Sequence, residues 1–176
     1  MLTLLGVIAG IIAVLLIVAA VSPKAYSTQR NILIDKPAAQ VFDYVKFLKN
    51  QDRFSKWATM DPNTLKTYTG VDGTPGFISA WDSKEKNVGK GEQEIIKVTD
   101  NTRIDFEIRF IKPFPGIAQS YMSTTAVTVS STEVVWALAS KMAYPMNIML
   151  LFMNMDTMIG KDLEIGLANL KRKLEA

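Results

Sequence analysis

The stretch that decides the fold is residues 145–174, which read PMNIMLLFMNMDTMIGKDLEIGLANLKRKL. Apolar residues recur in it at steps of three and four, and this spacing places them on one face of a helix. That face contains Ile148, Phe152, Met155, Ile159, Leu163, Gly166, Leu170 and Leu174. Pro145 suits a first helical turn, where its missing N–H would have no partner anyway. The sequence therefore predicts one long C-terminal helix.

The two halves of this helix differ in composition. The second half, residues 159–174, is amphipathic and is expected to seal a core. The first half is apolar nearly all round, so it must be enclosed or face something oily. Six of the nine methionines lie between Met142 and Met158, and methionine suits surfaces that adapt to varied apolar ligands. Core filling, cavity lining, and contact with a membrane or a partner all remain open.

Before this helix, the apolar pattern has a period of two. The clearest case is residues 103–110, where Ile104, Phe106, Ile108 and Phe110 alternate with charged side chains. Such alternation is typical of an antiparallel strand with one buried and one wet face. By the same reasoning we expect strands at residues 29–34, 65–69, 77–81, 92–98, 103–110, 119–129 and 133–141, and helices at 38–48 and 50–57. The fold class is α+β, with a curved antiparallel sheet packed on the long helix.

This order of elements, together with several local stretches, resembles the helix-grip fold of the START-like (SRPBCC) superfamily. The stretches are FSKWATMDPN (54–63), GFISAWDS (76–83), NVGKGEQEI (87–95), RIDFEIRFIKPF (103–114) and YPMNIML (144–150). They are similar to the polyketide cyclase/dehydrase-like branch. The resemblance covers residues 29–176 and implies a cavity between sheet and helix that holds a hydrophobic small molecule. Because fold does not settle activity, the ligand stays undetermined.

The apolar faces suggest which side chains line such a cavity. We expect the lining to comprise Phe77, Trp81, Phe106, Ile108, Phe110, Trp136, Met149, Phe152 and Met153. Trp57 and Trp81 stand in family-like stretches, where each can anchor a core corner or stack on a ligand. The loop at residues 112–116 is either a cavity mouth or an ordinary proline-stiffened turn. Tyr68, Tyr121 and Tyr144 are candidates to supply a hydroxyl inside the cavity.

Composition excludes several kinds of chemistry. The chain has neither cysteine nor histidine, which rules out the usual zinc sites, Ser-His-Asp and Cys-His nucleophiles, and haem ligation through these residues. We predict no metal, no cofactor and no catalytic residue. The net charge of +3 is mild and its lysines are scattered, so no nucleic-acid partner is expected.

Two other patterns have ordinary explanations. Glu92 and Glu94, and likewise Asp105 and Glu107, share a strand face and are interpreted as cross-strand charge pairs rather than an acid/base pair. The glycines between residues 70 and 91 match neither a P-loop nor a dinucleotide fingerprint. They are interpreted as turns and bulges.

The N-terminal segment is the second decisive stretch. Residues 2–21 contain no charge and, as a helix, would span about 30 Å, the thickness of a bilayer's hydrocarbon core. The alternative is a signal peptide cleaved before Val21, although the apolar run is long and no basic residue precedes it. We expect residues 1–23 to be a single-pass anchor in the cell membrane, 24–28 a linker and 29–176 the START-like domain. Lys24, Arg30 and Lys36 favour a cytoplasmic domain, but three charges leave its side open.

Three functions follow from these expectations. The first is a membrane-tethered module that binds or transfers a hydrophobic small molecule, a lipid or an aromatic metabolite. The second is a cyclase- or dehydratase-type enzyme that uses a polar residue in the same cavity. The third is a protein-interaction module with an exposed apolar surface. The sequence leaves the oligomeric state undetermined.

Overall fold

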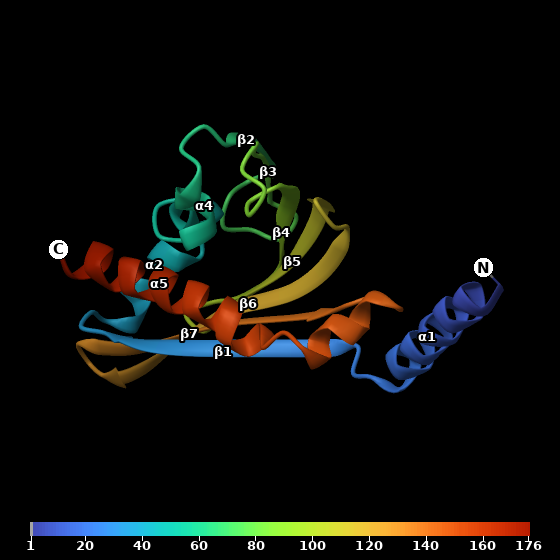
Figure 1. The fold of residues 1–176 in the computed structure, drawn as a ribbon. Coiled ribbons are helices and arrows are strands. Elements are labelled where there is room, and N and C mark those ends of the chain that lie inside the picture. The colour runs from blue at the N-terminus through green and yellow to red at the C-terminus, as the bar shows by residue number, and fades with distance from the viewer. Residues whose placement is uncertain (1) are drawn as a thin grey trace.

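The computed structural model describes residues 2–176 (Figure 1). Its elements are α1 (Leu2–Val21), β1 (Ala25–Ile34), α2 (Ala38–Val45), α3 (Leu48–Gln51), α4 (Lys56–Met60), β2 (Leu65–Thr69), β3 (Ile78–Asp82), β4 (Lys90–Thr99), β5 (Arg103–Lys112), β6 (Gly116–Thr128), β7 (Ser131–Lys141), the 3₁₀ helix η1 (Met146–Leu151) and α5 (Met155–Glu175). The predicted order of strand, helices, six strands and long helix is confirmed. The first strand begins at Ala25, so most of the expected linker at 24–28 belongs to the sheet.

The described strands form one antiparallel sheet in the order β1-β7-β6-β5-β4-β3-β2. Hairpins connect each consecutive pair of strands from β2 to β7. The first strand in the sequence, β1, pairs with the last, β7. The sheet is strongly curved (Figure 1). α5 packs on β1 and β7, and α2 lies on β6 and β7. A curved sheet around a long C-terminal helix is the helix-grip architecture expected from the sequence.

The main core lies between α2, α5 and one end of the inner face of the sheet. Side chains at alternate positions of the strands meet the apolar stripes of the helices there, and burial of such side chains drives folding. The buried cluster includes Ile34, Phe42, Val45, Phe54, Ile104, Phe106, Met122, Val134, Leu163, Leu167 and Leu170. We call the sheet positions Ile34, Ile95, Ile104, Phe106, Met122 and Val134 the core row.

The predicted single helix over residues 145–174 is wrong in its first half. Residues 146–151 form the 3₁₀ helix η1, and α5 starts only at Met155. The side chain of Asn154 accepts a hydrogen bond from the Thr157 N–H at 2.9 Å, so it acts as the N-cap of a new helix. The apolar residues keep their spacing of three and four across this break. The spacing therefore did not indicate that the helical backbone is interrupted at residues 152–154.

The N-terminal helix α1 projects from the end of the sheet where β1 begins (Figure 1). Within residues 2–176, the segment Thr3–Val21 is the one helix long and apolar enough to cross a membrane. A signal sequence near an N-terminus would meet the same criteria. Met1 of the expected anchor lies outside the described residues.

Candidate functional site

The inner face of the sheet carries a second row of side chains, beside the core row, that lines a cavity of about 290 Å³. Each strand contributes to it at an inward-facing position. We call these residues the pocket row: Lys66, Ser79, Gln93, Ile108, Ser120, Leu138 and Tyr26, from β2 across to β1. Ile108 pairs with Gln93, and Gln93 pairs with Ser79, so this part of the floor runs straight across three strands.

The roof of the cavity comes from the helices. Leu48 and Gln51 of α3, Trp57 of α4 and Ile159 of α5 line it from above. At one end the lining comes from Asn87 and Val88, from Lys112 at the end of β5, and from Pro113 and Phe114 in the loop that follows it. Phe114 is 75% exposed, so this end is the mouth of the cavity. The loop at 112–116 thus lies at the mouth.

All three tryptophans of the chain line the cavity. Trp57 and Trp136 meet edge to face with ring centroids 6.3 Å apart. Trp81 meets Phe110 in the same way at 6.4 Å, a geometry that aromatic pairs prefer. The ring of Trp81 also lies against Gly91, where a Cβ would come within 2.6 Å of it. Because Gly91 has no side chain, the Trp81 ring can occupy this position in the cavity wall.

Two of the three indole nitrogens, those of Trp136 and Trp81, have hydrogen-bond partners. Trp136 donates to the Ser120 hydroxyl at 3.3 Å, and that hydroxyl donates to the Ala137 carbonyl at 2.7 Å. Trp81 donates to the Val88 carbonyl at 3.1 Å. These bonds fix the rings, so the apolar walls of the cavity are held in a defined shape.

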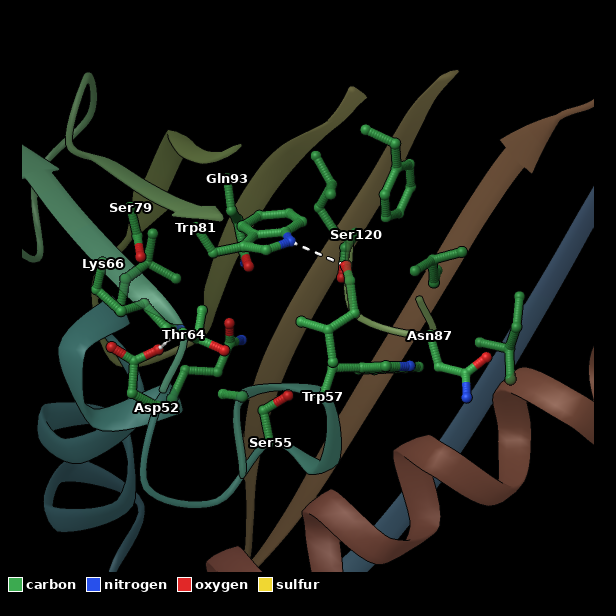
Figure 2. Close-up of a pocket in the computed structure, with 18 of the residues that line it drawn as sticks. Asp52, Ser55, Trp57, Thr64, Lys66, Ser79, Trp81, Asn87, Gln93 and Ser120 are labelled. Atoms are coloured by element: carbon green, nitrogen blue, oxygen red, sulfur yellow. Dashed lines mark hydrogen bonds and ion pairs between the residues drawn. The ribbon is translucent and has the colours of Figure 1, made fainter. Parts of the chain in front are cut away.

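One end of the cavity is polar. Figure 2 shows Asp52, Thr64, Lys66 and Ser79 gathered near β2. The Lys66 ammonium lies 2.5 Å from Asp52, and the Tyr68 hydroxyl donates to the same carboxylate at 2.6 Å. Burial, together with the bond to Asp52, raises the pKa of Tyr68 well above its usual range. Tyr68 is therefore a neutral hydrogen-bond donor at ordinary pH.

The structure brings four of the nine predicted lining residues together. Trp81, Ile108, Phe110 and Trp136 line the cavity. Phe77 and Phe106 are instead fully buried in the core, 1% and 0% exposed. They lie on the predicted face of the sheet, but farther along it, where the helices cover it.

Among residues 2–176, the lining of the cavity does not include Met149, Phe152 or Met153. Phe152 is 83% exposed. Because α5 begins after these residues, they lie in η1 and in the bend that follows it. The correction has one cause, the helix break at Asn154.

Sequence reasoning missed the polar end of the cavity. Ser79 and Gln93 occupy inward positions between apolar neighbours such as Phe77, Trp81 and Ile95. A polar residue at an inward position is a signal that could have indicated a solvated pocket. Asp52 and Lys66 gave no such signal, because only the tertiary fold joins them.

The remaining carboxylates have structural roles. Arg109 contacts Glu92, Glu94 and Glu107 at 2.6–2.8 Å on the outer face of the sheet, which confirms their interpretation as charge pairs. The bond from Arg109 lowers the pKa of Glu107. Among residues 2–176, no group of three or more His, Cys, Asp or Glu residues could hold a metal ion.

Two of the tyrosines considered from the sequence, Tyr121 and Tyr144, lie outside the cavity. The Tyr121 hydroxyl donates to the Gln29 side chain, and Tyr144 lies beside α1. A second hollow of about 480 Å³ has mixed walls that include Gln29, Arg103, Asp105 and Tyr121. These polar groups bond to one another, so we assign no ligand to this hollow.

Fold and cavity together define a helix-grip protein with a chamber between its sheet and helices. The profile of the family described as "Polyketide cyclase / dehydrase and lipid transport" matches residues 26–175. The chain therefore belongs to this family, within the START-like superfamily. A search of curated proteins finds no match.

Solved structures give the same fold. A protein of Nitrosospira multiformis is 14% identical with a TM-score of 0.59, covering 85% of this chain and 96% of its own. A Thermobifida fusca protein is 19% identical with a TM-score of 0.56, covering 84% and 92%. Norcoclaurine synthase of Thalictrum flavum, solved with dopamine and hydroxybenzaldehyde, is 9% identical with a TM-score of 0.62, covering 89% and 91%. At these identities the likeness establishes the fold alone.

Proposed function

We propose that this protein is a membrane-tethered module that binds or transfers a small amphipathic molecule in the cavity between sheet and helices. The observation that carries the proposal is the cavity itself. Its volume of about 290 Å³ is just below the range of about 300–1,000 Å³ typical of ligand pockets. The family description, which includes lipid transport, supports the same class of function.

The lining indicates what kind of molecule fits. Three tryptophans, Phe110 and Ile108 offer a rigid apolar wall, which suits an aromatic ring or an acyl chain. At the other end, Lys66, Ser79 and Gln93 offer donors to a hydroxyl or a carboxylate. The ligand class is therefore a small hydrophobic molecule with one polar end, such as a fatty acid or a phenolic metabolite.

The tether rests on α1. Its twenty residues are uncharged, and a helix of this length spans a bilayer core. A lipid-like ligand partitions into the same bilayer, so a tether would bring the module to its ligand. If the tether is retained, the full-length protein stays in membranes washed with carbonate. Release by the wash would contradict the tether.

A second candidate function is catalysis in the same cavity. The observation that favours it is the pair of Asp52 and Lys66 in the lining of the polar end, with Tyr68 bonded to Asp52 from outside the lining. A positioned donor and carboxylate beside a bound ligand are elements of acid–base chemistry. The replacement Asp52→Asn separates the two functions: an enzyme would keep its ligand and lose conversion, measured as a change in ligand mass. A binding module would return its ligand unaltered in both proteins.

The binding proposal is tested with a dansyl-labelled fatty acid and a polyphenol. Because the tryptophans line the cavity, a bound dansyl group should accept their emission in a saturable way. The matched variants are Phe110→Ala and Ile111→Ala, which are adjacent on β5, but only Phe110 lines the cavity. We expect the first to weaken binding about tenfold, equivalent to about 1.4 kcal/mol, and the second to leave it unchanged. Equal effects, or no saturable signal from folded protein, would contradict the proposal.

A further inference from the structure

The junction between α1 and η1 is built from a buried polar side chain. Asn147 of η1 is 0% exposed, and its amide nitrogen lies 2.7 Å from the Ala19 carbonyl and 3.3 Å from those of Ser22 and Pro23. The last carbonyls of a helix have no partner within it, and Pro23 has no N–H to offer Ala19. The globular domain therefore contains a socket for the C-terminal end of α1.

Further contacts fasten the same junction. The Met142 N–H donates to the Lys24 carbonyl at 2.8 Å, on the other side of the short connection at residues 22–24. Ala19 is completely buried although most of α1 is exposed. The end of α1 is thus fixed against the domain, and the position of α1 determines where η1 lies.

Around this socket, η1 and its flanks expose large apolar side chains. They are Tyr144, Met146, Met149, Leu151 and Phe152, between 38% and 83% exposed, and we call them the η1 patch. An exposed apolar patch of this kind marks an interaction surface. Lys24 and Lys141, which flank the paired ends of β1 and β7, are exposed beside it.

We infer that the η1 patch lies in the interfacial layer of the lipid bilayer that α1 enters. The inference rests on the tether of the proposed function. A bilayer is the occupant that fits, because the apolar surface of α1 requires hydrocarbon next to the socket that holds its end. Aromatic and lysine side chains are favoured at the membrane–water boundary, and the two lysines attract anionic lipid headgroups.

This placement has a consequence for the cavity. Tyr26, at the start of β1, lines the cavity close in sequence to the end of α1. In Figure 1, η1 and α1 lie at the same end of β1. A domain held with this end on the membrane turns the mouth of the cavity toward lipid, so a ligand passes between bilayer and cavity without crossing bulk water.

The absence of cysteine from the chain allows a direct test with single introduced thiols. Phe152→Cys places an environment-sensitive NBD label in the η1 patch. Val129→Cys is the matched control, because Val129 is 94% exposed at the β6–β7 turn, at the opposite end of the sheet. The full-length protein is reconstituted in vesicles of phosphatidylcholine and phosphatidylglycerol and washed with carbonate before measurement.

We expect the label at position 152 to shift its emission to the blue and to be quenched several-fold more by spin-labelled lipid than the label at 129. Asn147→Ala frees the end of α1, so it should reduce this difference while the protein remains in the washed membranes. If labels 152 and 129 behave alike in washed membranes, the inference is overturned and the tether stands. Release by the wash overturns both. Cross-linking of copies through position 152, without lipid quenching, would assign the patch to self-association instead.

Discussion

The core row and the pocket row lie side by side on one face of one sheet, yet one is sealed and the other is hollow. Strand β5 crosses from one to the other. Ile104 and Phe106 are 0% exposed, whereas Phe110, on the same face, is 36% exposed. The alternation of side chains is identical in both parts. What differs is the cover, because Leu163, Leu167 and Leu170 of α5 fill the first part and the short helices α3 and α4 arch over the second.

This difference teaches that strand periodicity determines a face but not its burial. A row becomes core where a long amphipathic helix lies directly on it, and becomes a cavity where the covering elements are short. The long helix is also held to the sheet by ion pairs, because Arg30 of β1 contacts Asp156 at 2.9 Å and Glu164 at 2.6 Å on α5. Gly160 makes room for the Arg30 guanidinium. These contacts form a polar clamp between α5 and β1.

The largest effect should come from truncating one phenylalanine of the core row and one phenylalanine of the cavity wall. Phe106→Ala removes a fully buried ring and should cost about 3–5 kcal/mol of unfolding free energy. Phe110→Ala borders open space and should cost about 1 kcal/mol. Urea unfolding of the full-length protein in nanodiscs, followed by tryptophan fluorescence, measures both. Equal losses would mean that the cavity wall carries as much packing energy as the core.

The next effect concerns Gly91. In Gly91→Ala the new Cβ would lie 2.6 Å from both the Arg109 carbonyl and the Trp81 ring. Such overpacking should cost about 1–3 kcal/mol and displace the indole. Gly116→Ala is the control, since nothing lies within 4 Å of its Cβ position. The same unfolding assay compares them, and a neutral Gly91→Ala would show that the cavity wall yields without cost.

A smaller effect separates the polar end of the cavity from the surface. Lys66→Met removes a donor from the pocket row, whereas Lys90→Met removes the exposed partner of Asp82. We expect the first to weaken binding of a carboxylate-bearing probe about tenfold, or about 1.4 kcal/mol, and the second to change nothing. Fluorescence titration distinguishes them. If both variants bind normally, the polar end does not contact the ligand.

The smallest effect concerns the ion pair between Arg30 and Asp156 in the polar clamp. The bond from Arg30, and then that from Thr28, lowers the pKa of Asp156 below its ordinary value of 3.8. At acidic pH, Asp156 therefore binds a proton more readily in the unfolded chain than in the folded protein. The contribution of this carboxylate to the unfolding free energy is present at pH above 3.8 and is lost as the pH falls through the lowered pKa of the folded protein. Asp156→Asn should flatten the fall in urea midpoint between neutral and acidic pH. An unchanged pH profile would show that the clamp is not coupled to folding.

The sequence predicted the sheet well, because each strand, Arg103–Lys112 above all, carries its own alternating signal. It predicted Trp81, Ile108, Phe110 and Trp136 at the cavity for the same reason. The prediction of the cavity lining failed at Met149, Phe152 and Met153. The periodic apolar pattern continues across the break before α5, where Asn154 caps the new helix. The junction of α1 with η1 also depends on a contact between residues 128 positions apart in the chain.

The pocket row also explains how the wall of such a cavity can change while the fold is kept. Each strand supplies one residue to it, from Lys66 on β2 to Tyr26 on β1, while the core row on the same strands maintains the packing. A substitution in one row leaves the other in register, because neighbouring inward positions are two residues apart. The composition of the chamber can thus diverge one strand at a time while the sheet stays the same, which is consistent with a shared fold at 9–19% identity among the structures compared.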